Sequence, residues 1–307
     1  MNSSDNHFTS RRNFVGVITK SMGFSVLLAP SGIDLLSNGL WKVQRAFTVG
    51  EVIDLFLKEI PGAPFEKTVD TLKSGSKSQQ VTGIVTTMFA TVEIIRKAIE
   101  RKANFIIAHE PTFYNHQDET SWLEKDEVYR YKADLLQKHN IAVWRCHDYI
   151  HSHRPDGVRA GVVKALGWEK YVDADNPALI TIPAIPLKDL ITHAKGRLGI
   201  SNLRYAGDLS LFCHRILLMP GASGGRSQIE ATGKVKPDLL MCGELSEWET
   251  AEYIRDARLK SQKIALVILG HAASEEPGLE WMASWLKKAL PGMRIEHIAS
   301  QNPLSFI

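Results

Sequence analysis

Cysteine is scarce in this 307-residue chain, and its scarcity excludes two kinds of cross-link. Cys146, Cys213 and Cys242 are an odd number without a close pair, so they form neither a disulfide framework nor a thiolate zinc site. Each lies in or beside an apolar run, as a small buried side chain would. Long apolar runs are also missing: no segment has the length and continuity of a membrane-spanning helix, so we expect no membrane span.

The chain also lacks a dense block of lysine and arginine with interleaved aromatic residues, which argues against nucleic acid as a partner. Its net charge of +3 is only mildly basic, and its charged fraction of 23% is close to that of an average globular protein. With 44% hydrophobic residues, the chain can bury one large core or two lobes. Histidine, with eleven copies, is the titratable residue type to follow.

The N-terminus has the pattern of an export signal. Ser10, the pair Arg11-Arg12, Phe14 and a short apolar stretch resemble the twin-arginine motif S-R-R-x-F-L, with a valine at the leucine position. An arginine pair alone can arise by chance, but the pair with this context is more specific. We therefore predict a signal peptide and linker over about residues 1–45, followed by one domain over residues 46–307. The predicted location is periplasmic or extracellular, with a cytoplasmic location as the alternative.

Apolar segments with strand and helix periodicity alternate after residue 47. Strands are expected at 80–86, 104–108, 141–146, 215–219, 238–241, 263–269 and 294–298. The first helix is expected to open at Thr48 or Gly50 and to reach residue 60. Further helices are expected at 90–102, 129–139, 158–166, 187–198, 248–258 and 275–290. The region 173–212 is less clear, and Ile185-Pro186 suggests a loop before a helix. This alternation predicts an α/β fold with a largely parallel sheet.

Three of these strands end in side chains that bind metals. The first leads into His109-Glu110, the second into His147-Asp148 and His151, and the third into His271 and Glu275. In α/β sheets, ligands gather beyond the carboxyl ends of the strands. One histidine at a strand end is more often a hydrogen-bonded structural residue, but three such ends in one chain favour a shared site.

The residue types indicate which metals such a site would hold. Imidazole with carboxylate favours zinc, iron, manganese or cobalt over calcium. His109, Glu110, His151, His271 and Glu275 are more ligands than one tetrahedral ion needs, so we predict two divalent ions. His147, Asp148 and His153 lie close to His151 in sequence and could take its place.

Several stretches resemble the NIF-three-like family of dinuclear-metal-centre proteins, whose bacterial members are often called GTP cyclohydrolase I type 2. The resemblance covers the chain from about residue 48 to its end. Residues 104–113 are similar to the family's strand followed by His-His-Pro-x-x-Phe, and residues 147–167 to its His-x-x-x-Asp segment and the following helix. Further similar stretches are Gly270–Glu275 (Gly-His-x-x-x-Glu), Cys242–Glu244 (Thr-Gly-Glu) and Asn302-Pro303.

The resemblance places His109, His271 and Glu275 on unchanged metal-ligand positions, whereas two positions differ. Glu110 stands where the family has a second histidine, and His151 stands where it has an aspartate. The exchange is reciprocal, so the set keeps three imidazoles and two carboxylates. The resemblance also implies two similar α/β lobes with mixed, largely parallel sheets, a metal site between them, and a homo-oligomer, up to a toroidal hexamer.

Two functions follow as alternatives. The first is a metal-dependent hydrolase of a small substrate, nucleotide-like or phosphorylated, in which Glu244, or one of the additional groups near His147 and Asp148, could relay protons. Export would make cytoplasmic GTP a doubtful substrate. The second is a non-catalytic metal-binding or scaffold protein, because a shared fold does not settle activity. A metal-free α/β protein with structural histidines is a third, weaker interpretation.

Overall fold

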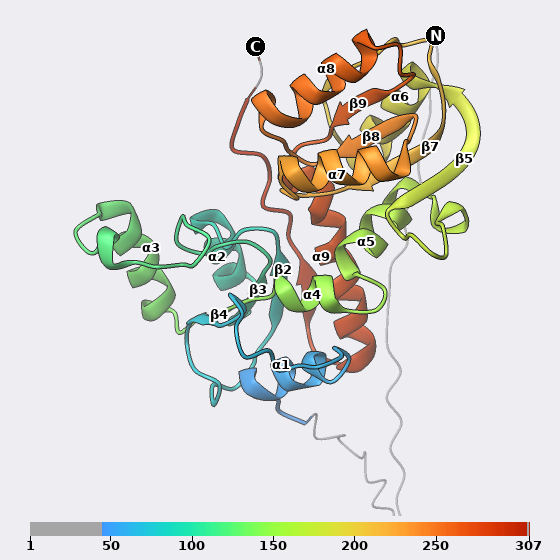
Figure 1. Cartoon of the computed structure of the whole chain (residues 1–307). Coiled ribbons are helices and arrows are strands. Elements are labelled where there is room, and N and C mark those ends of the chain that lie inside the picture. The colour runs from blue at the N-terminus through green and yellow to red at the C-terminus, as the bar shows by residue number, and fades with distance from the viewer. Residues whose placement is uncertain (1–44, 306) are drawn as a thin grey trace, which may run out of the picture. The chain divides into compact units, whose positions relative to one another are not determined.

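Two five-stranded mixed sheets form the framework of the protein, for which a computed structural model describes residues 45–305 and 307 (Figure 1). The first sheet has the order β1 (Leu72–Ser74), β4 (Ala142–Arg145), β3 (Phe105–Ala108), β2 (Ile84–Thr87), β10 (Ile295–His297). The second has the order β5 (Leu179–Pro186), β7 (Phe212–Met219), β8 (Leu239–Cys242), β9 (Ala265–Ile268), β6 (Arg204–Ala206). Only the edge strands β1, β5 and β6 are antiparallel to their neighbours. The predicted mixed α/β fold with two sheets is therefore confirmed.

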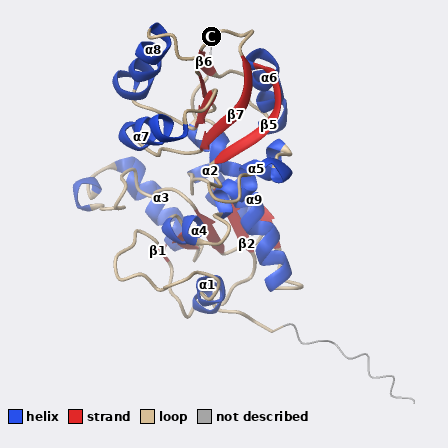
Figure 2. Cartoon of the chain, turned by 45° about the vertical axis from the view of Figure 1, so that its right-hand side comes forward, coloured by secondary structure: helices blue, strands red, loops and turns tan. Residues whose placement is uncertain are grey.

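Helices cover both faces of the two sheets (Figure 2). They are α1 (Val49–Leu57), α2 (Val92–Glu100), α3 (Glu127–Lys138), α4 (Asp148–Ser152), α5 (Gly157–Leu166), α6 (Leu187–Leu198), α7 (Gly225–Val235), α8 (Glu252–Leu259) and α9 (His271–Ala289). On the first sheet, α1 and α9 pack on one face while α2 and α3 pack on the other. On the second sheet, α5 and α6 oppose α7 and α8.

The central strands are apolar on both faces because both faces are covered. In β3, Phe105 and Ile107 enter the core under α1 and α9, whereas Ile106 enters the core under α2 and α3. This two-residue alternation is the ordinary consequence of the pleat. Such strands read as continuous apolar runs, which is why they could be recognised in the sequence.

Helix α9 links the two halves of the fold. It begins directly after β9 of the second sheet and packs against β2 and β10 of the first (Figure 1). It also crosses α5 closely, where a Cβ added to Gly161 would lie 2.3 Å from the Pro277 carbonyl oxygen. Glycine therefore allows the backbones of α5 and α9 to approach each other closely.

We expect Gly161→Ala to lower the free energy of unfolding by about 1–3 kcal/mol, because the added methyl group must push α5 away from α9. Gly196→Ala in α6 is the matched control, since a Cβ there meets nothing within 4 Å. That control should be neutral or stabilising by up to about 1 kcal/mol, as alanine is the better helix former. Urea unfolding of the two variants measures both effects, and equal stabilities would refute the close-approach explanation.

Some local predictions were wrong. The loop expected at Ile185-Pro186 is instead the end of strand β5. Proline is tolerated there because β5 is an edge strand, so the missing N–H breaks no hydrogen bond to a second neighbouring strand. The short strand β1 over residues 72–74 is not among the strands expected above. The helix expected from residue 248 begins as a π-helical turn over Glu247–Ala251 and continues as α8.

The predicted twin-arginine signal lies outside the described residues. Within residues 45–305 and 307, no helix combines the length and apolar character needed to cross a membrane.

Candidate metal centre

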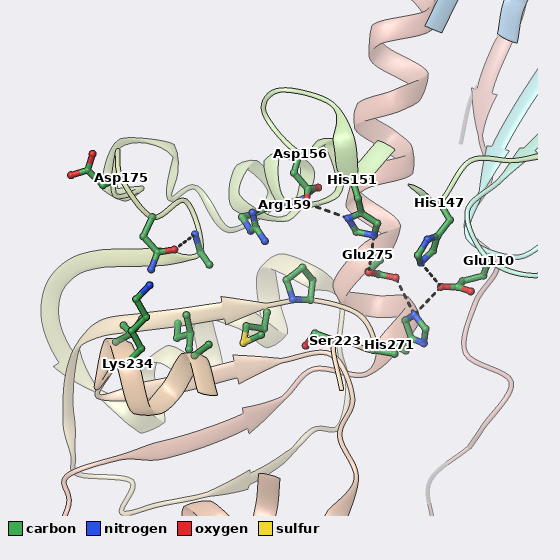
Figure 3. A pocket seen from close by; sticks show the side chains of 18 residues that line it. Glu110, His147, His151, Asp156, Arg159, Asp175, Ser223, Lys234, His271 and Glu275 are labelled. Carbon is green, nitrogen blue, oxygen red and sulfur yellow. Dashed lines mark hydrogen bonds and ion pairs between the residues drawn. The ribbon is translucent and has the colours of Figure 1, made fainter. Parts of the chain in front are cut away.

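The structure brings together all five side chains predicted as metal ligands. His109 and Glu110 follow β3, His151 lies in α4, and His271 and Glu275 stand one turn apart at the start of α9. Glu275 Oε2 lies 3.0 Å from His271 Nε2 and 3.4 Å from His109 Nε2, and Glu275 Oε1 lies 3.9 Å from His151 Nε2. Glu110 Oε1 lies 3.3 Å from His271 Nε2. Segments more than 100 residues apart in sequence therefore share one cluster (Figure 3).

His147, which the sequence offered only as a substitute for His151, belongs to the same cluster. It follows β4, which is paired with β3, so it emerges beside His109. Its ring stacks on that of His109 with the centroids 4.8 Å apart, and its Nε2 lies 3.8 Å from Glu110 Oε1. The feature of the sequence that indicates His147 as a site residue is its place directly beyond a strand, because it is the second residue after β4.

The four histidines of the cluster share one orientation. Each directs Nε2 toward the two glutamates and Nδ1 toward an oxygen outside the cluster. Nδ1 of His109 lies 3.1 Å from Cys146 O, and Nδ1 of His147 lies 3.0 Å from Asp148 Oδ1. Nδ1 of His151 lies 3.2 Å from Asp156 Oδ2, and Nδ1 of His271 lies 3.5 Å from Glu244 Oε2. An Nδ1–H that donates outward leaves a lone pair on Nε2, which is the usual preparation of a metal-binding histidine.

This donor set fits a metal ion. The Nε2 atom of His109 is buried and has no hydrogen-bond partner among the described residues. The ligand atoms of His109, Glu110 and Glu275 lie within 4.8 Å of one another, as do those of His109, His147 and His151. A buried nitrogen without a partner is costly unless something compensates it. These buried histidine and glutamate groups could therefore bind a metal.

The two glutamates of the cluster raise the pKa of the histidines that they face, and these histidines lower the pKa of the glutamates. Burial would raise the pKa of Glu275, but His109 and His271 outweigh burial and hold that pKa well below its usual range. Burial would lower the pKa of His271, but Glu110 and Glu275 outweigh it and raise the pKa to about 10. A cation that binds His271 Nε2 must therefore compete with a proton.

The turn after β7 makes room for Glu275. Gly221 has φ +68°, and a Cβ at this position would lie 2.0 Å from Glu275 Oε1. The Gly221 N–H donates to Ser274 Oγ at 2.9 Å, which ties the turn to α9. Glu244, the residue predicted to relay protons, follows β8 and is about half exposed beside His271. Its backbone N–H donates to the Gly221 carbonyl oxygen at 3.0 Å, so the turn also places Glu244.

Glu110 has a partner that the sequence did not reveal. The fully buried guanidinium group of Arg145 lies 3.5 Å from Glu110 Oε2 and 3.6 Å from Asp118 Oδ2. Its Nη1 also donates to the His116 carbonyl oxygen. Arg145 is the last residue of β4, where the sequence shows only an arginine inside an apolar run. Because one oxygen of Glu110 faces Arg145, the other is the one that faces His147 and His271.

A cavity of about 650 Å³ opens onto the cluster. Glu110, His147, His151, His271 and Glu275 line one end of it, and Figure 3 shows Lys234 of α7 at the opposite end with Arg159 of α5 between them. Apolar side chains form the wall between these polar groups, including Leu217, Met219, Pro220, Ala231 and Val235. A volume of this size suits a small molecule.

Comparison with known proteins gives a family and a fold. A family model described as Duf34/NIF3 (NGG1p interacting factor 3) matches residues 49–303. A Clostridium acetobutylicum protein named GTP cyclohydrolase 1 type 2 homolog is 28% identical over 244 residues, which are 75% of this chain and 87% of that protein.

Two solved structures show the same fold. The crystal structure of the Staphylococcus aureus hypothetical protein SA1388 matches with a TM-score of 0.68 at 19% identity, over 86% of this chain and all of that one. A Bacillus cereus protein related to NIF3 matches with a TM-score of 0.67 at 16% identity, over 85% of this chain and 99% of that one. At these identities the likeness concerns the arrangement of the two sheets.

Proposed function

Because the chain belongs to the Duf34/NIF3 family, we propose that it is a dinuclear-metal protein that hydrolyses a small substrate. The observation that carries the proposal is the convergence of histidine Nε2 atoms on two buried carboxylates. His109, Glu110, His151, His271 and Glu275 would hold two divalent cations, chosen from zinc, iron, manganese and cobalt. Bound there, the cations would act as Lewis acids and lower the pKa of a water molecule.

The residues around the cavity would position the substrate. Arg159 and Lys234 are cationic, so they favour an anionic group such as a phosphate. Arg159 Nη1 lies 3.9 Å from Asp156 Oδ2, so the guanidinium group is already partly oriented. The apolar wall between the two ends suits the body of a nucleotide-like or other phosphorylated molecule. A substrate that spans the cavity would place its anionic end away from the reacting bond.

Glu244 is the residue that we propose as the proton relay. Its carboxylate lies 3.5 Å from His271 Nδ1, it is about half exposed, and it follows the strand next to β9. From this position it can exchange a proton with His271 Nδ1 and with solvent, so it would relay protons through His271. Assembly as a homo-oligomer and export by the twin-arginine route are further parts of this proposal, and both rest on sequence resemblance.

Elemental analysis of the purified, untagged protein and a hydrolysis panel test the proposal together. The panel contains esters, amides and phosphates, with GTP included because a relative carries the cyclohydrolase name. Two metal ions per chain with turnover of one class would support the hydrolase. Two ions without turnover, and a stable complex with a partner, would favour the metal-binding or scaffold alternative. A protein without bound metal after loading would contradict both.

A further inference from the structure

We propose that His147 is a sixth metal ligand, and that His109, His147 and His151 together form a three-imidazole face for one of the two cations. The inference rests on the proposed metal centre and adds a residue to it. Three neutral imidazoles with an open fourth position are a complete protein ligand set for a catalytic zinc-type ion. The remaining ligands, His271 and the two glutamates, would bind the second cation and would lie between the two cations.

The position of His147 supports this role. The ligand nitrogens of His109, His147 and His151 lie within 4.8 Å of one another. The rings of His147 and His151 are 5.1 Å apart between centroids and nearly perpendicular, at 72°. About a quarter of the His147 side chain is exposed, and His147 lines the cavity. Its Nε2 therefore faces the place where the other ligands meet.

The surroundings of His147 hold its ring in this orientation. Nδ1 lies 3.0 Å from Asp148 Oδ1, and Asp148 Oδ2 accepts hydrogen bonds from Thr68 Oγ1 at 2.7 Å and from the Val69 N–H at 3.2 Å. The His147 N–H donates to buried Asp70 at 2.8 Å. A carboxylate that fixes Nδ1 is the outer support seen behind metal-binding histidines, and Asp156 gives His151 the same support.

Glu110 explains why an additional ligand is needed. Its Oε2 faces the Arg145 guanidinium group at 3.5 Å, which leaves Oε1 as the oxygen directed at the cluster. A carboxylate that is shared with a buried arginine has less negative charge and fewer free donor atoms for a cation. It therefore binds that cation more weakly than a histidine at the same position would. His147 Nε2, 3.8 Å from Glu110 Oε1, lies where it can supply the missing donor.

The test compares His147→Ala with His116→Ala by titrating metal-free protein with Co²⁺ and recording the visible absorption spectrum. His116 is an exposed histidine whose ring lies 5.9 Å from that of His147 but which belongs to neither ligand group, so it is the matched control. Loss of an outer support alone typically weakens metal binding about 10–100-fold. We therefore expect His147→Ala to weaken one of the two Co²⁺ sites by about 100-fold or more and to change its spectrum, whereas His116→Ala changes neither.

Two Co²⁺ ions bound by His147→Ala with wild-type affinity and spectrum would overturn the inference and leave the proposed function standing. A wild-type protein that binds no Co²⁺ would overturn both. An equal loss in His116→Ala would also overturn the inference, because the effect would not depend on position. If His147→Ala does not fold, Asp148→Asn takes its place: it keeps the imidazole, and we expect about 10–100-fold weaker binding at the same site.

Discussion

Glu275→Gln is expected to remove metal binding at the cluster almost completely. Glu275 lies within 3.9 Å of three of the four histidines, and both of its oxygens face them. Glutamine keeps the size of the side chain but removes the negative charge and one of the two acceptor oxygens. Because loss of an outer support already costs about 10–100-fold, we expect the loss of this central ligand to lower affinity by more than about 100-fold.

Elemental analysis after dialysis and calorimetric titration with Zn²⁺ measure this loss. Glu276→Gln is the control on the same helix. The Glu276 carboxylate accepts hydrogen bonds from the N–H groups of Met88 and Ser300 and does not contact the cluster histidines. We expect the control to bind Zn²⁺ as the wild type does. Unchanged metal content in Glu275→Gln would remove this residue from the ligand set.

Arg145→Met is expected to destabilise the metal-free protein by about 3–5 kcal/mol. The guanidinium group is fully buried between Glu110 and Asp118. Lys73, at 3.2 Å from Asp118, and His271, at 3.3 Å from Glu110, lie on the other sides of these two carboxylates. Removing one partner of a buried ionic network leaves a buried charge without compensation, which is far more costly than losing the attraction itself. Methionine fills much of the volume, so the effect reports charge more than packing.

Urea unfolding of the metal-free proteins measures this difference, with Arg101→Met as the control. Arg101 pairs with Glu296 at 2.6 Å, but both side chains are about 40% exposed. A surface pair of this kind contributes about 1 kcal/mol or less. Equal effects of the two substitutions would show that the Arg145 network does not support the loop that carries Glu110.

The main part of the fold followed from the sequence because its strands are covered on both faces. Continuous apolar runs such as Phe105–Ala108 fit strands of a sheet that is buried on both faces. The exceptions lie at sheet edges. β5 contains Pro183 and Pro186, and its partner β7 lies more than 20 residues later in the chain, so only the tertiary structure makes this segment a strand.

The sequence indicated which residues belong to the site, because they follow strand ends. It did not indicate how these side chains lie relative to one another. Parallel pairing of β3 with β4 places His109 beside His147, and this pairing cannot be read from the spacing of the two residues. The direction of each imidazole depends on its Nδ1 partner, and those partners come from loops, from helix ends and from a backbone carbonyl. Arg145 was overlooked for the same reason, since its ionic partners lie 27 and 35 residues earlier in the chain.

An anomalous-scattering crystal structure of the Zn²⁺-loaded protein tests the central proposal most directly. We predict two peaks at the zinc edge, each within bonding distance of Nε2 atoms from His109, His147, His151 or His271 and of a Glu110 or Glu275 oxygen. Zinc peaks located elsewhere would contradict the proposal. A structure in which these side chains keep their mutual contacts and no zinc peak lies among them would contradict it as well.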